Sequence, residues 1–123
     1  MPDYLDVVVV DFDDTLCPFS EDFTCRTVVP GAIDALNRIR EAGYVVVISS
    51  ARNNTMYGGY GGEPHRDMVQ FLHAKGIPHD RIDTGTNGKP VAYRYIDDKG
   101  VGCPLTEDGV VDWPGVCELL LGG

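Results

Sequence analysis

Basic residues are scarce in this sequence of 123 residues, which contains 10 lysines and arginines against 19 aspartates and glutamates. The formal net charge of -9 repels polyanions, so we expect no unspecific binding to nucleic acid or to an anionic membrane surface. The end phosphate of a nucleic acid stays open as a ligand, because a single phosphate needs only local positive charge. Any anion that this protein binds must therefore meet positive charge supplied at the binding site itself.

Paired cysteines and long apolar runs are also absent. The four cysteines, Cys17, Cys25, Cys103 and Cys117, form no C-x-x-C pair and have no histidine cluster beside them. Their spacing argues against a zinc site, and their low number argues against a disulfide-stapled secreted domain. No apolar run approaches the roughly 20 residues of a membrane span, and the N-terminal residues lack the features of a signal peptide. These absences predict a cytoplasmic protein with reduced thiols.

The length and the 43% of hydrophobic residues suit one globular domain with its own core. Neither a repeat nor an internal linker divides the chain, so we expect a single domain over residues 1–123. Short β-branched runs predict buried strands, and apolar residues spaced three and four apart predict helices. In chain order the prediction is strand 5–10, helix 31–42, strand 44–48, helix 63–75, strands 81–84 and 93–96, and a last helix capped by Asp112 with Trp113 in the core.

This alternation predicts a three-layer, Rossmann-like α/β fold, with a parallel central sheet and helices on both faces. Polar side chains directly follow three of the predicted strands. In chain order they are Asp11 and Asp13, Ser49 and Ser50, and Asp97 and Asp98. Ligands of parallel α/β sheets bind beyond the carboxyl ends of the strands, so folding should bring the three groups to one edge.

Several carboxylates at one edge need a counter-charge. Two unit charges ~4 Å apart repel by about 4 kcal/mol at an effective dielectric constant near 20, so gathered carboxylates must take up protons or bind a cation. Oxygen ligands suit Mg²⁺, which commonly binds one or two carboxylates together with substrate phosphate and water. Lys89, which follows a glycine turn, could bind a phosphate oxygen, and Ser50 could donate a hydrogen bond to phosphate.

Four sequence elements occur in a fixed order: D-x-D-x-T at Asp11, Asp13 and Thr15, Ser50 within S-A-R, Lys89, and Asp97 and Asp98 within Y-I-D-D-K. In these elements the chain resembles the haloacid dehalogenase (HAD) superfamily of phosphatases, with Ser49 as the alternative to Ser50. The resemblance covers about residues 5–99. The segments 17–30 and 53–62 are too short for the inserted cap domain of larger relatives, so the chain resembles the small, capless HAD-like hydrolases.

The resemblance implies a Mg²⁺-dependent phosphatase that acts on a phosphate monoester. Asp11 would attack phosphorus to form an aspartyl-phosphate, and Asp13 would protonate the leaving oxygen and then activate water. The resemblance assigns the Mg²⁺ ligands to the Asp11 side chain, the Asp13 main-chain carbonyl and Asp98, with Asp97 in support. It assigns the phosphate contacts to Ser50 or Ser49, Lys89 and Thr15.

Residues near the predicted site allow more than one interpretation. Tyr57 and Tyr60, in the glycine-rich loop, could stack on a base or sugar, but a simple tether between strand and helix is the favoured interpretation. Arg52 could contact substrate or pair with an acidic residue. His65 could contact substrate, but a solvated residue at a helix start is the favoured interpretation.

Two other functions compete with the phosphatase. A phosphoryl-accepting receiver domain of two-component signalling also combines an acidic pair, Mg²⁺ and a late lysine. A receiver, however, needs its acceptor aspartate after a middle strand, and here Ser49 and Ser50 follow the second strand. A catalytically inactive HAD-like binding protein is the other alternative.

Overall fold

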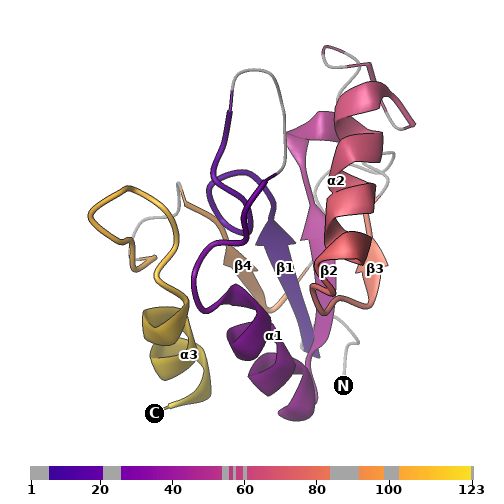
Figure 1. Ribbon diagram of the computed structural model, residues 1–123. Coiled ribbons are helices and arrows are strands. Elements are labelled where there is room, and N and C mark those ends of the chain that lie inside the picture. The colour runs from indigo at the N-terminus through magenta and orange to yellow at the C-terminus, as the bar shows by residue number, and fades with distance from the viewer. Residues whose placement is uncertain are drawn as a thin grey trace.

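A computed structural model describes residues 6–20, 26–53, 56, 58–59, 61–83, 92–98 and 103–122. Strands and helices alternate along this part of the chain, as the sequence predicts (Figure 1). In order they are β1 (Val7–Asp11), α1 (Ala32–Glu41), β2 (Val45–Ser49), the short 3-10 helix η2 (Ala51–Asn53), α2 (Glu63–Ala74), β3 (Arg81–Ile82), β4 (Arg94–Ile96) and α3 (Trp113–Leu121).

The four strands form one parallel sheet in the order β3-β2-β1-β4. Strand β1 therefore lies inside the sheet, between β2 and β4 (Figure 1). This is the order of the first four strands of the doubly wound dinucleotide-binding fold. The predicted Rossmann-like α/β class with a parallel central sheet is confirmed.

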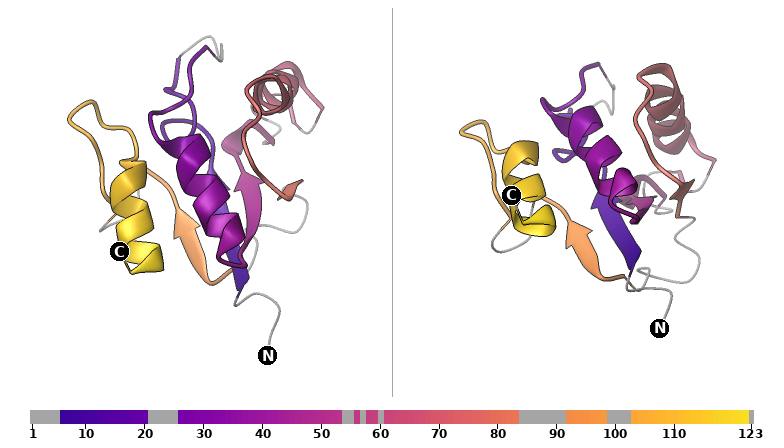
Figure 2. Two further views of the ribbon diagram at one scale, coloured as in Figure 1. Left: turned by 60° about the horizontal axis from the view of Figure 1, so that its bottom comes forward. Right: turned by 90° about the horizontal axis from the view of Figure 1, so that it is seen from below.

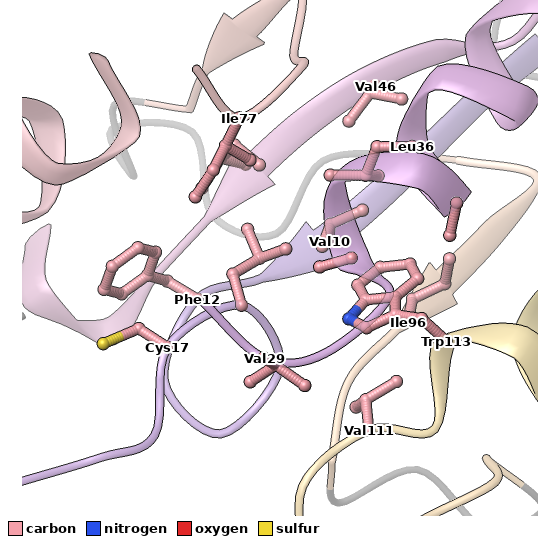
Figure 3. Close-up of a cluster of buried hydrophobic side chains, with 14 of the residues drawn as sticks. Val10, Phe12, Cys17, Val29, Leu36, Val46, Ile77, Ile96, Val111 and Trp113 are labelled. Atoms are coloured by element: carbon pink, nitrogen blue, oxygen red, sulfur yellow. The ribbon is translucent and has the colours of Figure 1, made fainter. Parts of the chain in front are cut away.

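Both faces of the inner strands β1 and β2 are buried, in keeping with their continuous valine. One face, which includes Val10 and Val46, packs against α1, α2 and α3, and Figure 2 shows these helices on the same side of the sheet. Figure 3 shows this core, in which Phe12, Leu36 and Trp113 gather around the strands. The opposite face is a second buried cluster of Val7, Val9 and Val47. Helices were predicted on this face too; residues 84–91, in the connection from β3 to β4, lie outside the described residues.

The last helix is fastened to the loop that follows β1. Asp112 caps α3, since its Oδ1 accepts a hydrogen bond from the Gly115 N–H at 3.3 Å. Trp113 is fully buried, and its Nε1 donates to the main-chain carbonyl of Thr15 at 2.7 Å. The predicted cap and the predicted core position of the tryptophan are both confirmed.

The element boundaries differ little from the prediction. Strand β3 is shorter than predicted, with two residues in the ladder, and Thr84 lies outside the described residues. Among the cysteines that the structure describes, Cys17, Cys103 and Cys117 form no disulfide. Within the described chain we find no helix with the length and apolar character needed to cross a membrane.

Candidate active site

The carboxyl ends of the three neighbouring strands β2, β1 and β4 meet at Asp11. In the β1–β2 ladder Asp11 is the register partner of Ser49. In the β1–β4 ladder Val10 pairs with Ile96, so Asp97 follows on the other side of Asp11. Neighbouring strands lie roughly 4.8 Å apart, so the structure brings the three polar groups to one edge as the sequence predicts.

Asp11 is a strongly perturbed carboxyl group at this edge. Loss of solvent on burial raises the pKa of Asp11 to about 7, against a hydrogen bond with the main chain of Phe12 that lowers it. The neighbouring charges of Asp97, Asp98 and Asp13 raise this pKa further. Near neutral pH Asp11 therefore needs either a proton or a nearby cation.

The second aspartate of the D-x-D motif is held by an arginine. Arg52 donates from Nε to Asp13 Oδ2 at 3.1 Å and from Nη2 to Asp13 Oδ1 at 2.8 Å. The Arg52 side chain is 1% exposed and the Asp13 side chain 21%. The sequence left Arg52 open between a substrate contact and an ion pair, and the structure shows the ion pair.

Arg52 is also held from two further directions. Its Nη1 donates to the main-chain carbonyl of Pro64 at 3.0 Å, in the first turn of α2. Its guanidinium carbon lies 4.9 Å from the ring centroid of Phe12, within the range of a cation–π contact. No local pattern signals these contacts, because Arg52 and Asp13 are 39 positions apart in the sequence.

The two candidate serines have different surroundings. Ser49 ends β2 beside Asp11. Ser50 Oγ accepts a hydrogen bond from the Arg52 main-chain N–H at 3.1 Å. A hydroxyl both accepts and donates, so this contact orients Ser50 and leaves its proton for a phosphate oxygen. Which of the two serines binds phosphate stays a prediction.

Thr15 is enclosed beneath the edge. Its side chain is fully buried, and the described residues offer its Oγ1 no hydrogen-bond partner. Its main-chain carbonyl accepts the Trp113 hydrogen bond, which ties this loop to α3. This placement gives Thr15 a structural position, and direct contact between its hydroxyl and phosphate stays a prediction.

The carboxylates do not form a ready cage for a metal. Within the described residues, no group of three histidine, cysteine, aspartate or glutamate side chains could hold a metal ion. Asp13 directs both carboxylate oxygens to Arg52, which leaves Asp11 and Asp98 as the predicted side-chain ligands. Such a set fits Mg²⁺, which keeps several waters and needs only one or two carboxylates. The oxygen donors and the unneutralised charge at Asp11 fit this ion, and its binding stays a prediction.

Several predicted residues lie outside the described part of the chain. They are Lys89 and the loop tyrosines Tyr57 and Tyr60.

The favoured prediction for His65, a solvated residue at a helix start, is wrong. Its side chain is 5% exposed, and its Nδ1 accepts a hydrogen bond from the Gly61 N–H at 3.1 Å. His65, Met68 and Leu72 share the buried face of α2, since positions i, i+3 and i+7 of a helix lie on one side. Burial lowers the pKa of His65, which favours a neutral ring. The helical spacing could have revealed this placement.

Comparison with known proteins supports the fold. No protein-family model matches the chain, and no curated protein matches its sequence. Among solved structures, the chain is similar to a conserved protein coded by a locus from Bacteroides thetaiotaomicron, with a TM-score of 0.72 and 21% sequence identity. The similarity covers 96% of this chain and 91% of the other. At this identity the likeness shows the fold, which extends over nearly the whole chain.

Proposed function

We propose that this chain is a Mg²⁺-dependent, HAD-type phosphohydrolase that cleaves a phosphate monoester through an aspartyl-phosphate on Asp11. The observation that carries the proposal is the position of Asp11 at the carboxyl end of an inner strand, between Ser49 and Asp97. Its raised pKa, about 7, shows how strongly this position resists an unneutralised negative charge. Enzymes concentrate such perturbed groups at reactive sites.

The proposed chemistry divides between two carboxylates. An ionised oxygen of Asp11 forms a bond to phosphorus while the bond from phosphorus to the leaving oxygen breaks. Asp13 gives a proton to the leaving oxygen, then removes a proton from the water that attacks the aspartyl-phosphate and releases inorganic phosphate. Asp11, Asp98 and the main-chain carbonyl of Asp13 would hold Mg²⁺, with Asp97 in support. Bound there, the ion supplies the positive charge that an ionised Asp11 and an anionic substrate require.

Other residues of the edge would hold the phosphoryl group. The Ser50 hydroxyl, oriented by the Arg52 N–H, would donate to a phosphoryl oxygen, with Ser49 as the alternative. Lys89 would add positive charge. Thr15 belongs to the same motif and is assigned to the phosphate side by resemblance alone.

The strand order favours this proposal over a receiver domain. The flavodoxin-like order of receivers places β1 between β2 and β3. Here β3 lies beyond β2, and β1 has β2 and β4 as neighbours. Asp11 ends β1, where a phosphohydrolase of this type needs its nucleophile. A binding protein without catalytic activity is the alternative that an activity assay must separate.

Hydrolysis of p-nitrophenyl phosphate, followed by a panel of phosphorylated sugars, nucleotides, oligonucleotide ends and phosphopeptides, tests the proposal. We expect turnover that requires Mg²⁺ and stops on chelation. Asp11→Asn should reduce kcat by roughly 1,000-fold or more, because the amide is a poor nucleophile. Asp34→Asn makes the same chemical change on the exposed side of α1 and should leave the rate unchanged. No turnover of any compound in the panel would support the binding protein instead.

A further inference from the structure

The Arg52–Asp13 pair occupies an environment in which a charge must be fully compensated. Arg52 is among the largest fully buried side chains, although arginine is rarely buried without a partner. Its Nε and Nη2 meet the two oxygens of Asp13, and its Nη1 meets the Pro64 carbonyl. A guanidinium holds a carboxylate by two parallel hydrogen bonds, which an ammonium group cannot do.

These contacts join three parts of the chain that are separate in sequence. Asp13 lies in the loop after β1, Arg52 lies in η2, and Pro64 lies in the first turn of α2. The Ser50 hydroxyl accepts from the Arg52 main-chain N–H, so the same turn carries a candidate phosphate ligand and the arginine. A shift of Arg52 would therefore move the carboxylate of Asp13 relative to the phosphate position.

A direct contact between Arg52 and substrate is the competing explanation. The burial of the side chain argues against it, since only 1% of that surface is exposed. Nitrogens at all three positions of the guanidinium already donate to protein oxygens. With 1% of the side chain exposed, a phosphate could reach this group only if the surrounding residues moved.

Resting on the proposed function, we propose that Arg52 is a positioning residue that fixes the orientation of the Asp13 carboxylate for proton transfer. Proton transfer requires heavy atoms within about 2.6–3.2 Å, and a free aspartate side chain rotates out of that range. The two-point contact removes this rotation. The arginine thus acts on the rate through Asp13, without touching the phosphate.

Arg52→Lys tests this role because it keeps the positive charge and removes the two parallel hydrogen bonds to Asp13. We expect kcat to fall by roughly 10- to 100-fold, since small misplacements of reacting groups have effects of this size. KM should stay within about twofold, because the phosphate contacts remain. Arg40→Lys is the matched control, made in the exposed Arg40–Asp80 pair, and should change neither constant. A wild-type kcat for Arg52→Lys would overturn the inference.

A double-mutant cycle separates positioning from substrate contact. In an Asp13→Asn background, Arg52→Lys should cause no further loss of kcat, because the group that it positions is already absent. A further loss in that background, or a large rise in KM, would show that Arg52 contacts substrate and would overturn the inference.

Thermal unfolding of each variant shows whether the rates refer to folded protein. If Arg52→Lys fails to fold, Asp13→Glu replaces it, because this variant keeps the buried arginine and the negative charge but moves the carboxylate by one methylene. Its kcat should fall with KM unchanged, and a wild-type kcat would overturn the inference. Failure of the proposed function is separate, because it would show as wild-type protein without any Mg²⁺-dependent turnover.

Discussion

Two arginine–aspartate pairs lie at opposite ends of the sheet and differ in almost every other respect. At the carboxyl end, Arg52 binds Asp13 through two hydrogen bonds, with 1% and 21% of the side chains exposed. At the amino end, Arg40 binds Asp80 through one contact of 3.0 Å, with 43% and 32% exposed. Asp80 also accepts a hydrogen bond from the main-chain N–H of Val46, at the start of the sheet ladder, at 2.7 Å.

The two pairs differ in how far solvent screens them, and the buried pair is the one that holds the carboxylate to which the proposed function gives the proton transfer. An exposed pair contributes little to stability because water and salt screen it. A buried pair constrains its partners strongly, because either group left alone would be a buried charge. The Asp80 carboxylate binds the main chain at the start of β2, whereas the Asp13 carboxylate lies within the D-x-D motif to which we assign the proposed catalysis.

Removal of the buried partner should have the largest effect on stability. Arg52→Ala leaves the Asp13 carboxylate without its two donors and also leaves a space under Phe12. We expect a loss of about 3–5 kcal/mol in the free energy of unfolding, measured by urea denaturation. A loss below about 1 kcal/mol would mean that the pair behaves like a surface contact, and the contrast between the two ends would disappear.

The pH dependence of stability should have opposite signs at the two ends. The pKa of Asp11 rises from 3.8 to about 7 on folding, mainly through burial, so the folded state holds this proton more tightly. With a chelator present, the contribution of Asp11 to the free energy of unfolding should therefore fall as the pH rises from 3.8 to about 7. The Asp11→Asn variant should lose that decline, as measured by urea denaturation across this pH range.

Asp80 provides the matched case. Burial alone would raise the pKa of Asp80, but the Val46 N–H and the Arg40 guanidinium outweigh it and lower the pKa. The stabilising contribution of the Asp80 carboxylate is therefore present above pH 3.8. It is lost as the pH falls through the lowered pKa of the folded protein. Asp80→Asn should lower the free energy of unfolding at neutral pH. The free energy of unfolding of this variant should also fall less steeply than that of the wild type as the pH is lowered. An identical pH profile for both variants would contradict the opposite shifts.

The stability gained on adding Mg²⁺ should also depend on the ionisation of Asp11. The ion needs the ionised form of Asp11, so its stabilising effect should grow as the pH rises through about 7. In Asp11→Asn this stabilisation should be lost. A stabilisation that is equal at low and high pH would show that Mg²⁺ binds elsewhere.

The fold was predictable because its signals are local or follow from topology. Strand β1 was expected over 5–10 and spans Val7–Asp11, and α2 was expected over 63–75 and spans Glu63–Ala74. The meeting of Asp11, Ser49 and Asp97 also followed from sequence, because parallel strands place their carboxyl ends at one edge.

Contacts that depend on side-chain direction were not predictable in this way. No pattern in the sequence indicates which acidic residue pairs with Arg52, because several acidic residues follow the strands. The choice of Asp13 depends on the packing of η2 between Phe12 and the first turn of α2, which only the folded chain establishes. The burial of His65 was missed for a different reason, since the helical spacing was present but the polar residue was assumed to face water.

The smallest expected effect is at the exposed pair. Arg40→Ala removes one contact from Asp80, which keeps its hydrogen bond from the Val46 N–H. We expect a loss of less than about 1 kcal/mol in the free energy of unfolding, which should shrink further at high salt because screening already weakens this pair. Urea denaturation at low and high salt measures both quantities, and kcat should stay at the wild-type value throughout. A large, salt-independent loss would show that Arg40 helps to anchor the start of β2, and the amino end of the sheet would then depend on its ion pair as strongly as the carboxyl end does.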